Sequence, residues 1–310
     1  MRTAFITALQ ELAEHDDRVT LVVGDLGFGV VEPFAKRFPS RYVNPGVAEQ
    51  NMTGIAAGMA MSGKVVFTYS IGNFPTLRCL EQIRNDVCYH SADVKIVSVG
   101  GGFSYGSLGM SHHATEDLAI MRALPRMTVV APGDPVEAAA ATRALAAMPG
   151  PAYLRLGRAG EPIVHQGPIS FTIGKAITVR EGTDVTLIAT GGILEQAMVA
   201  ADQLAARGVQ TRVLSMHTIK PLDTDAVLKA ASETGAIATL EEHSILGGLG
   251  GAVAEVLAEH APWKIPFTRI GMDSTFVSKA GDQEYLRDMF GLSAPAVVNR
   301  LLALMDTSNR

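Results

Sequence analysis

One carboxylate, Glu49, stands in an almost wholly small and apolar stretch, NPGVAEQNMTGIAAGMAMSG at residues 44–63. A carboxyl group held among apolar neighbours tends to keep its proton, because burial disfavours the charged form. Such a group could share a proton with a nitrogen atom of a bound ligand. The structural alternative is simpler: a Pro-Gly turn precedes Glu49, and a carboxylate in a first helical turn stabilises the free N–H groups there. Residue types alone favour this alternative.

Two adjacent histidines, His112 and His113, lie in SHHATED at residues 111–117. A zinc site needs three or four ligands at set spacing, and this stretch offers no evident third ligand. We therefore expect no metal here. A histidine in a loop between a strand and a helix could hydrogen bond a polar substrate. A structural histidine that is satisfied within the fold is the equal alternative.

Aromatic residues are sparse, yet four of them gather in two short segments. These are Tyr69, Phe74, Phe103 and Tyr105. Core packing is the default explanation, and stacking against a flat heterocycle is the alternative. Arg158 follows the strand-like YLRLG and could pair with a phosphate or carboxylate. An interdomain salt bridge would explain the same arginine.

Glycine-rich segments occur at residues 24–29 (GDLGFG) and 247–255 (GGLGGAVAE). Neither has the G-x-G-x-x-G fingerprint with an acidic residue at the right distance. Tight turns between strand and helix explain them better than a dinucleotide site does. A nicotinamide dehydrogenase is thus supported by these glycines only.

Short β-branched runs alternate with helical patterns in the first half of the chain. The expected strands cover 18–25, 64–70, 93–101, 126–132 and 151–157, and the expected helices cover 47–61, 77–91, 115–124 and 134–147. This alternation is typical of a parallel sheet covered by helices. Ligands bind such sheets beyond the carboxyl ends of the strands, and the unusual residues named above fall at those ends.

The alternation lapses over residues 158–183, which are rich in Gly and Pro and lack a helical period, so we expect a linker there. It then resumes. The expected strands of the second half cover 184–192, 209–216, 235–243 and 266–272. The sequence therefore predicts an α/β fold with two parallel-sheet domains, in keeping with a length of 310 residues.

Composition excludes several classes of function. Lys and Arg number 26 and Asp and Glu 31, a net charge of −5 without a basic block, so nucleic acid and anionic membranes are poor partners. No apolar run approaches the length of a membrane span, and the N-terminal residues 1–18 read as an amphipathic helix rather than a signal peptide. Two cysteines make no disulfide scaffold. We expect a cytoplasmic protein.

Taken together, six stretches resemble the C-terminal half of transketolase from end to end. They are GVAEQNMTGIAAGMA (46–60), FPTLRCLEQIRNDV (74–87), GMSHHATEDLAIMRALPRMTVVAPGDPVE (109–137), YLRLGR (153–158), MHTIKPLD (216–223) and EEHSILGGLGGAVAE (241–255). The chain looks like the separate β-type subunit of a split transketolase, in the wider family of thiamine diphosphate enzymes. The resemblance implies a pyrimidine-binding domain at 1–165, a linker at about 166–183, and a transketolase C-terminal domain at 184–310.

The resemblance also gives Glu49 a role. In this family the glutamate of the matching motif hydrogen bonds N1′ of the cofactor's aminopyrimidine, and the shared proton favours the imino tautomer that activates thiazolium C2. Phe74 matches the aromatic residue that stacks on the pyrimidine ring. Asp25 matches an aspartate near the cofactor pocket, and Ile71 replaces an aromatic residue beside the stacking one.

The substrate side is implied in the same way. His112 matches the family histidine that meets the substrate's oxygens, and we assign its neighbour His113 to substrate binding too. Arg158 matches the arginine that holds a substrate phosphate. We therefore expect small sugar substrates, phosphorylated or otherwise anionic, and a place in carbohydrate metabolism.

Four departures from the family pattern concern the substrate. The motif G-E-D-G-P-T-H reads GSLGMSH at residues 106–112, which puts Leu108 where an aspartate recognises a sugar hydroxyl. Gly100 stands where transketolases carry another histidine. Gly27 and Gly29 stand where a hydroxyl or phosphate partner is expected. A modified sugar or an α-keto acid donor would fit this less polar pocket.

Thiamine diphosphate also needs a G-D-G motif and a later Asn that together hold a divalent metal, and this sequence has no G-D-G. The resemblance thus implies an α-type partner chain that binds the diphosphate with Mg²⁺ (or Ca²⁺). We expect an α₂β₂ heterotetramer in which this chain also self-associates. The C-terminal domain is expected to build the assembly, and no catalytic residue is assigned to it.

Three alternatives stay open beside a transketolase-like transferase. The first is the β subunit of a 2-oxo acid dehydrogenase, or a deoxyxylulose phosphate synthase-like enzyme, which shares the domain pair and the glutamate. The second is a binding or regulatory module that has no partner, against which the retained Glu49, Phe74 and His112 argue. The third is the nicotinamide dehydrogenase.

Overall fold

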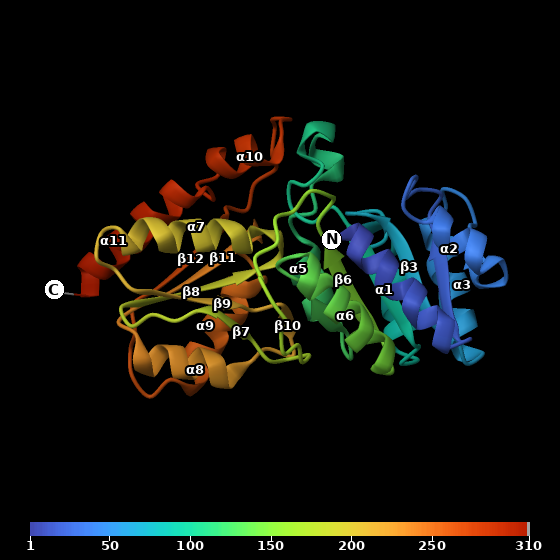
Figure 1. The fold of residues 1–310 in the computed structure, drawn as a ribbon, viewed down its shortest axis with the longest axis horizontal. Helices are drawn as coiled ribbons and strands as arrows, with labels where there is room; N and C mark the ends of the chain where they lie inside the picture. The colour runs from blue at the N-terminus through green and yellow to red at the C-terminus, as the bar shows by residue number, and fades with distance from the viewer. Residues whose placement is uncertain (309–310) are drawn as a thin grey trace.

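The computed structural model describes residues 1–308. Two sheets with helices on their faces lie side by side; the N-terminal half carries most of the first sheet, and the C-terminal half carries the second sheet and one strand of the first (Figure 1). The first sheet has seven strands in the order β10-β5-β6-β4-β3-β1-β2, and the second has five in the order β12-β11-β8-β9-β7. The predicted α/β fold with two mostly parallel sheets is confirmed.

The first half forms six strands and six α-helices among the described residues. The strands are β1 (Val19–Val23), β2 (Tyr42–Val43), β3 (Val65–Ile71), β4 (Val94–Val99), β5 (Thr128–Val130) and β6 (Ala152–Leu156). The helices are α1 (Arg2–His15), α2 (Glu32–Arg37), α3 (Glu49–Met61), α4 (Leu80–Gln82), α5 (Asp117–Ala123) and α6 (Pro135–Ala147). Short helical turns cover Pro39–Arg41, Leu77–Cys79, Ile83–Cys88, Gly106–Leu108 and Met110–His112.

The second half has a similar alternation. Its strands are β7 (Ile177–Arg180), β8 (Val185–Thr190), β9 (Thr211–Ser215), β10 (Thr218–Lys220), β11 (Ile237–Ser244) and β12 (Phe267–Met272). Its helices are α7 (Leu194–Ala205), α8 (Thr224–Glu233), α9 (Leu249–His260), α10 (Gln283–Met289) and α11 (Ala294–Ser308), with a short turn at Gly191–Ile193.

Central strands are buried on both faces, as a helix-covered parallel sheet requires. Every residue of β1, β4 and β6 is buried, and so is every residue of β8 and β9. These strands are the β-branched runs that the sequence predicts, shortened by one or two residues at each end. The core of each half is therefore built where hydrophobic patterning placed it.

The expected linker needs a correction. Strand β7 lies inside residues 166–183 and pairs antiparallel with β9 at the edge of the second sheet. Thr178 is exposed and the other three residues are only partly buried, because an edge strand packs only one face. This short strand lacks the continuous apolar run that marks the central strands, and the pattern therefore hid it.

Strand β10 crosses between the halves. It follows β9 of the second sheet, yet it pairs antiparallel with β5 of the first, with Thr218 opposite Val130 and Lys220 opposite Val129. The Nζ atom of Lys220 donates to the carbonyl oxygens of Arg122 (2.9 Å) and Leu124 (2.5 Å). The second half thus completes an edge of the first sheet.

Helix α6 begins with the predicted Asp134-Pro135 signal. The Asp134 carboxylate accepts from the N–H of Glu137 at 2.8 Å, while its second oxygen accepts from the N–H groups of Val164 and His165, both at 2.9 Å. One side chain therefore caps a helix and anchors the segment that leads to the second half.

A histidine and a glutamate, His165 and Glu137, form a pair at the same seam. His165 Nε2 is 2.7 Å from Glu137 Oε1, and this hydrogen bond raises the pKa of His165. Burial alone would raise the pKa of Glu137, but hydrogen bonds from His165 and from the N–H of Gly133 outweigh it and lower that pKa. His217 packs its ring on Phe171 at 4.0 Å, and burial lowers the pKa of His217.

None of the helices described between residues 1 and 308 is long and apolar enough to cross a bilayer. Both cysteines, Cys79 and Cys88, are buried free thiols. Burial raises the pKa of each to about 11, so both stay protonated and unreactive.

Candidate active site

The carboxyl ends of β1 and β3 and the start of α3 bring Glu49 into a crowded corner. Gly24 follows β1 and Ser70 lies near the end of β3. A Cβ atom at Gly24 would stand 3.2 Å from both Glu49 Cγ and Ser70 Oγ, tighter than ordinary contact. The small residues of this segment therefore let a helix start approach two strand ends closely. That is the position at which ligands bind open parallel sheets.

Glu49 itself is buried, with 1% of its side chain exposed. Arg78 Nη1 donates to Oε2 at 2.6 Å, and the Ser70 hydroxyl faces Oε1 at 3.4 Å. The carboxylate thus points at β3 and the turn that follows it, rather than at the N–H groups of its own helix, which begins at Glu49 without a side-chain cap. The simple capping role is not what this geometry shows.

Phe74 and His112 meet beside that ion pair. The Arg78 guanidinium lies over the Phe74 ring, 4.8 Å from its centre, and the His112 ring meets Phe74 edge-on at 5.2 Å. Burial lowers the pKa of His112, and its neighbour His113 adds to that effect, so the imidazole is neutral at neutral pH. A neutral imidazole can donate one hydrogen bond and accept another.

Tyr105 and Arg158 continue the line. The Tyr105 ring lies 6.4 Å from the ring of His112, and the Arg158 guanidinium lies 5.2 Å from the centre of the Tyr105 ring. Arg158 is exposed, so its charge is available to an anion. The contacts therefore form one continuous row: Glu49, Arg78, Phe74, His112, Tyr105 and Arg158.

Gly100 and Tyr105 share one space. Gly100 has a φ of +92°, and a Cβ atom there would stand 2.2 Å from Cδ2 of Tyr105. The tyrosine ring therefore occupies the volume that a larger residue at position 100 would need. Burial raises the pKa of Tyr105, so its phenol stays protonated. A buried aromatic ring thus fills the space beside Gly100, the position at which the resemblance leads us to expect a histidine.

Two further predicted cofactor residues lie at the same strand ends but outside the row. Asp25 is exposed, has a φ of 53°, and accepts from Asn44 Nδ2 at 2.9 Å. Ile71 ends β3, is half-buried, and its carbonyl accepts from the Phe74 N–H at 2.9 Å. Ile71 therefore fixes the turn that presents Phe74.

His113 occupies a different kind of place. Its ring is buried, meets Phe103 edge-on at 5.4 Å, and its Nε2 lies 3.1 Å from the carbonyl oxygen of Gly106. Direct substrate contact, which the sequence suggested for His113, conflicts with this position. The neighbouring His112 points the other way, into the row.

The residues present fit one end of the expected cofactor. A buried carboxylate beside a half-buried aromatic ring suits an aminopyrimidine, which offers both a ring nitrogen and a flat face. Among residues 1–308, no group of three or more His, Cys, Asp or Glu side chains could hold a metal ion.

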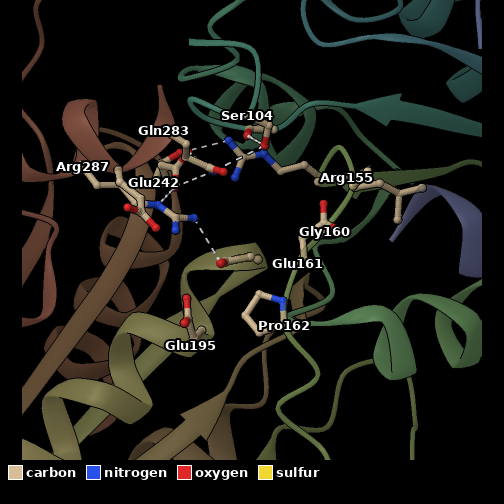
Figure 2. Close-up of a pocket in the computed structure, with 16 residues that line it drawn as sticks. Ser104, Arg155, Gly160, Glu161, Pro162, Glu195, Glu242, Gln283 and Arg287 are labelled. Carbon is tan, nitrogen blue, oxygen red and sulfur yellow. Dashed lines mark hydrogen bonds and ion pairs between the residues drawn. The ribbon is translucent and has the colours of Figure 1, made fainter. Parts of the chain in front are cut away.

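A separate cavity of about 320 Å³ lies between the halves, and Ser104 of the loop that carries Tyr105 lines it. Figure 2 shows Arg155 entering from the first half and Glu242, Gln283 and Arg287 from the second. This cavity is away from Glu49, and its walls hold buried charges that are already paired.

Arg155 is the centre of that charge network. Its Nε donates to Asp117 at 2.8 Å, and its Nη2 donates to the carbonyl oxygens of Ala114 (2.6 Å) and Glu242 (3.1 Å). Tyr153 also donates to Asp117, at 2.5 Å. Because Arg155 and Asp117 are both almost fully buried, the pair joins β6, α5 and β11 where water cannot replace it.

Sequence reasoning missed several of these roles. Arg78 lies in a quoted motif, but its pairing with Glu49 needs the turn after β3 to fold back over α3. The sequence shows Tyr105 only as one of four clustered aromatic residues. Arg155 sits inside a strand and gave no signal apart from being a charge in a run of buried residues.

Comparison with known proteins follows the same division of the chain. The family description "Transketolase, pyrimidine binding domain" matches residues 1–160, and "Transketolase, C-terminal domain" matches residues 174–297. The 6-deoxy-6-sulfo-D-fructose transketolase subunit SqwH of Clostridium sp. is 39% identical over 100% of this chain and 95% of that protein.

Two more relatives agree. An apulose-4-phosphate transketolase subunit of Phocaeicola vulgatus is 41% identical over 91% of this chain and 90% of that protein. A solved structure of a split gene transketolase, an inactive beta4 tetramer, is 39% identical, covers 99% of this chain and 97% of its own, and superposes with a TM-score of 0.87.

Proposed function

The chain belongs to the transketolase family, and we propose that it is the β-type subunit of a split transketolase that transfers a two-carbon ketol unit between sugars. The observation that carries this proposal is the row of contacts from Glu49 to Arg158. It sets a buried carboxylate, a stacking ring, a neutral imidazole and a free guanidinium in sequence at one sheet edge.

Thiamine diphosphate is the cofactor that this family implies. When bound, it supplies the nucleophilic carbon for the transfer. In this chain Glu49 would hold the aminopyrimidine nitrogen and Phe74 would stack on the ring. Arg78 occupies Oε2 of Glu49, while Oε1 has only the distant Ser70 hydroxyl, so Oε1 is the oxygen open to a ligand proton. Asp25 would line the same pocket, and Ile71 would hold the Phe74 turn in place.

The substrate would lie along the outer part of the row. The neutral His112 would donate or accept a hydrogen bond at a sugar oxygen, and Arg158 would pair with the anionic end of the sugar. The names of two relatives specify a sulfo sugar and a sugar phosphate. We therefore propose an anionic sugar substrate, and Leu108, where the resemblance leads us to expect an aspartate, would favour one that lacks a hydroxyl at that point.

A partner chain would complete the site. The sequence has no G-D-G motif, so an α-type subunit would bind the diphosphate through Mg²⁺ or Ca²⁺. Large apolar side chains are exposed around the row, where a partner would cover them. These are Phe28, Val47, Leu77, Leu108 and Met110, between 43% and 78% exposed. We propose an α₂β₂ assembly in which this chain also contacts a second copy of itself.

Location in the cytoplasm is the last part of the proposal. The two buried free thiols suit a reducing compartment. The full-length similarity to transketolase subunits argues against the dehydrogenase and partnerless-module alternatives. The 2-oxo acid alternative shares the same fold, so the assay must separate it.

The test is reconstitution with an α-type partner that co-purifies from the native cells. Ketol transfer between sugars is measured for the wild type, for Glu49→Ala and for Glu81→Gln, an exposed carboxylate on α4 that serves as control. Loss of about 10²–10⁴-fold in Glu49→Ala only, with no pyruvate consumption, supports the proposal. Full activity of Glu49→Ala, or turnover of pyruvate without a sugar donor, would refute it.

A further inference from the structure

The loop from Gly100 to His113 carries the outer half of the row, and its base is closed by backbone pairing. Gly102 N–H donates to the Ala114 carbonyl at 2.8 Å, and Ala114 N–H donates back at 3.0 Å. Residues 103–113 therefore form a lobe that includes Tyr105 and His112. How this lobe is held decides where those two side chains point.

Glu242, near the end of β11 in the second half, accepts a hydrogen bond from the first residue of the lobe. Its Oε1 accepts the N–H of Phe103 at 2.5 Å. Gln283 Nε2, at the start of α10, donates to both carboxylate oxygens at 2.9 and 3.1 Å, and Arg287 Nε donates to Oε2 at 2.5 Å. Figure 2 shows these three side chains converging beside Ser104.

The fit between lobe and second half leaves no space. A Cβ atom at Gly102, whose φ is +62°, would stand 2.4 Å from Glu242 Oε1. One at Gly106 would stand 2.5 Å from Cδ1 of Leu286 and 2.6 Å from the carbonyl oxygen of Gly281. The glycines thus let the backbone of the lobe lie directly against α10, and Figure 1 shows α10 beside this loop.

Charge also favours a rigid arrangement. Glu242 and Arg287 are 4% and 9% exposed at the side chain, and Arg287 Nη2 also donates to the carbonyl of Gly192 at 3.1 Å. A buried carboxylate with three donors has few other positions that satisfy it. The Phe103 ring adds apolar contact, stacking on Phe290 at 5.5 Å.

We propose that Glu242 is a positioning residue for the transferase site: the second half, through Glu242 and α10, holds the lobe so that Tyr105 and His112 face the substrate. The inference rests on the proposed function for its kinetic consequence, but the contact itself does not. It gives the C-terminal domain a part in substrate affinity, beyond assembly.

Two substitutions of Glu242 separate the effect of side-chain length from the effect of its negative charge. Glu242→Asp keeps the charge beside Arg287 but is one methylene too short to serve Phe103 and Arg287 together. Glu242→Gln keeps the reach and an oxygen that can accept from Phe103, but it leaves the buried Arg287 without its counter-charge, so we expect a loss of overall stability in this variant while the bond to Phe103 is kept. Glu284→Asp is the control, since Glu284 is exposed on the same helix and the structure gives it no contact to the lobe within residues 1–308.

The first measurement is amide hydrogen exchange of the isolated full chain, followed over residues 100–113. Glu242→Asp is expected to speed exchange in this segment about tenfold or more, because a hydrogen bond to a charged group is lost. Glu242→Gln keeps most protection at Phe103, and Glu284→Asp behaves as the wild type. Unchanged exchange in Glu242→Asp, or equal acceleration in β4 and β11, overturns the proposal.

The second measurement is kinetic, on the complex with the α-type partner. Glu242→Asp is expected to raise KM for the sugar about tenfold, with kcat changed less than about threefold and cofactor affinity unchanged. Glu242→Gln should recover most of the KM. A parallel loss of cofactor affinity contradicts positioning of the lobe alone. A wild-type complex without ketol transfer refutes the proposed function, while the exchange result still decides the role of Glu242.

Discussion

Arg78 holds the carboxylate of Glu49 at 2.6 Å, although Arg78 is 48% exposed and Glu49 only 1%. The buried Glu49 is fixed in position by its surroundings, whereas the guanidinium of Arg78 reaches it from the solvent. Water reaches the guanidinium, so the attraction is screened and the pair is adjustable rather than locked. A ligand that brings its own donor could take a share of Glu49 without disrupting the fold.

Weak coupling is the first expectation. Arg78→Met should lower the free energy of unfolding by about 1 kcal/mol, since screening limits the contribution of a half-exposed partner. A double-mutant cycle with Glu49→Gln, measured by urea denaturation, should give a coupling energy of about 1 kcal/mol. A coupling above about 3 kcal/mol would mean that the pair behaves as a buried one.

The second prediction concerns the space beside Gly100, which the Tyr105 ring occupies. Gly100→Ala forces a Cβ against the Tyr105 ring and a left-handed backbone on alanine, so the unfolding free energy should fall by about 3 kcal/mol. In a Tyr105→Ala background the same change should cost about 1 kcal/mol, because only backbone strain remains. Equal losses in both backgrounds would show that the ring is not the obstacle.

Arg158 gives the third. Arg158→Ala should raise KM for an anionic sugar about 10- to 100-fold in the reconstituted complex, because a charge-assisted hydrogen bond to the anion is lost. Neutral analogues of the same sugar should show little change. If both sugars lose affinity equally, Arg158 acts through Tyr105 and not through the anion.

The buried pair of Arg155 and Asp117 gives the fourth. Asp117→Asn leaves a guanidinium buried without its counter-charge, so the unfolding free energy should fall by about 3–5 kcal/mol. Asp202→Asn removes the partner of Arg180 in an exposed pair and should change it by less than about 1 kcal/mol. Thermal or urea unfolding of both variants checks this contrast.

The fifth concerns pH. Pairing with Glu137 raises the pKa of His165, so its stabilisation is complete below the ordinary value of 6.5 and is lost as pH rises through the raised pKa. Glu137 has a lowered pKa, so its share is lost only when pH falls below its ordinary value of 4.5 and through that lowered pKa. His165→Gln should therefore destabilise the chain more at about pH 6 than at about pH 9. If the difference in unfolding free energy between the wild type and His165→Gln instead grew as the pH rose, a charged pair of His165 and Glu137 would be excluded.

Local pattern predicted what depends on neighbours in sequence. Runs such as VTLVV in β1 are buried on both faces, and their continuous apolar and β-branched composition predicts that burial. Strand β7 and strand β10 were missed, because their pairing depends on segments far away in the chain rather than on their own residues. Antiparallel edge strands of three or four residues carry too little hydrophobic signal to be seen.

The site divides in the same way. Glu49, Phe74, His112 and Arg158 were predicted by motif, and they share one row. Arg78 and Glu242 act through contacts with residues that are 29 and 139 positions away in the sequence. Tyr105 acts by filling the space beside Gly100. His113 was assigned to substrate binding only as the neighbour of His112, yet its buried ring faces the carbonyl oxygen of Gly106. Spacing alone cannot tell two adjacent side chains apart in a loop.

Strand β10 has a consequence for how the chain can be divided. Cutting within residues 166–183 would leave the first sheet without the strand that covers β5, and would free a row of backbone groups able to pair with another chain. The two sheets should thus melt in one cooperative transition, and neither should persist as a separate fragment. In evolutionary terms, a gene of this kind should resist a break between the two halves that share this sheet.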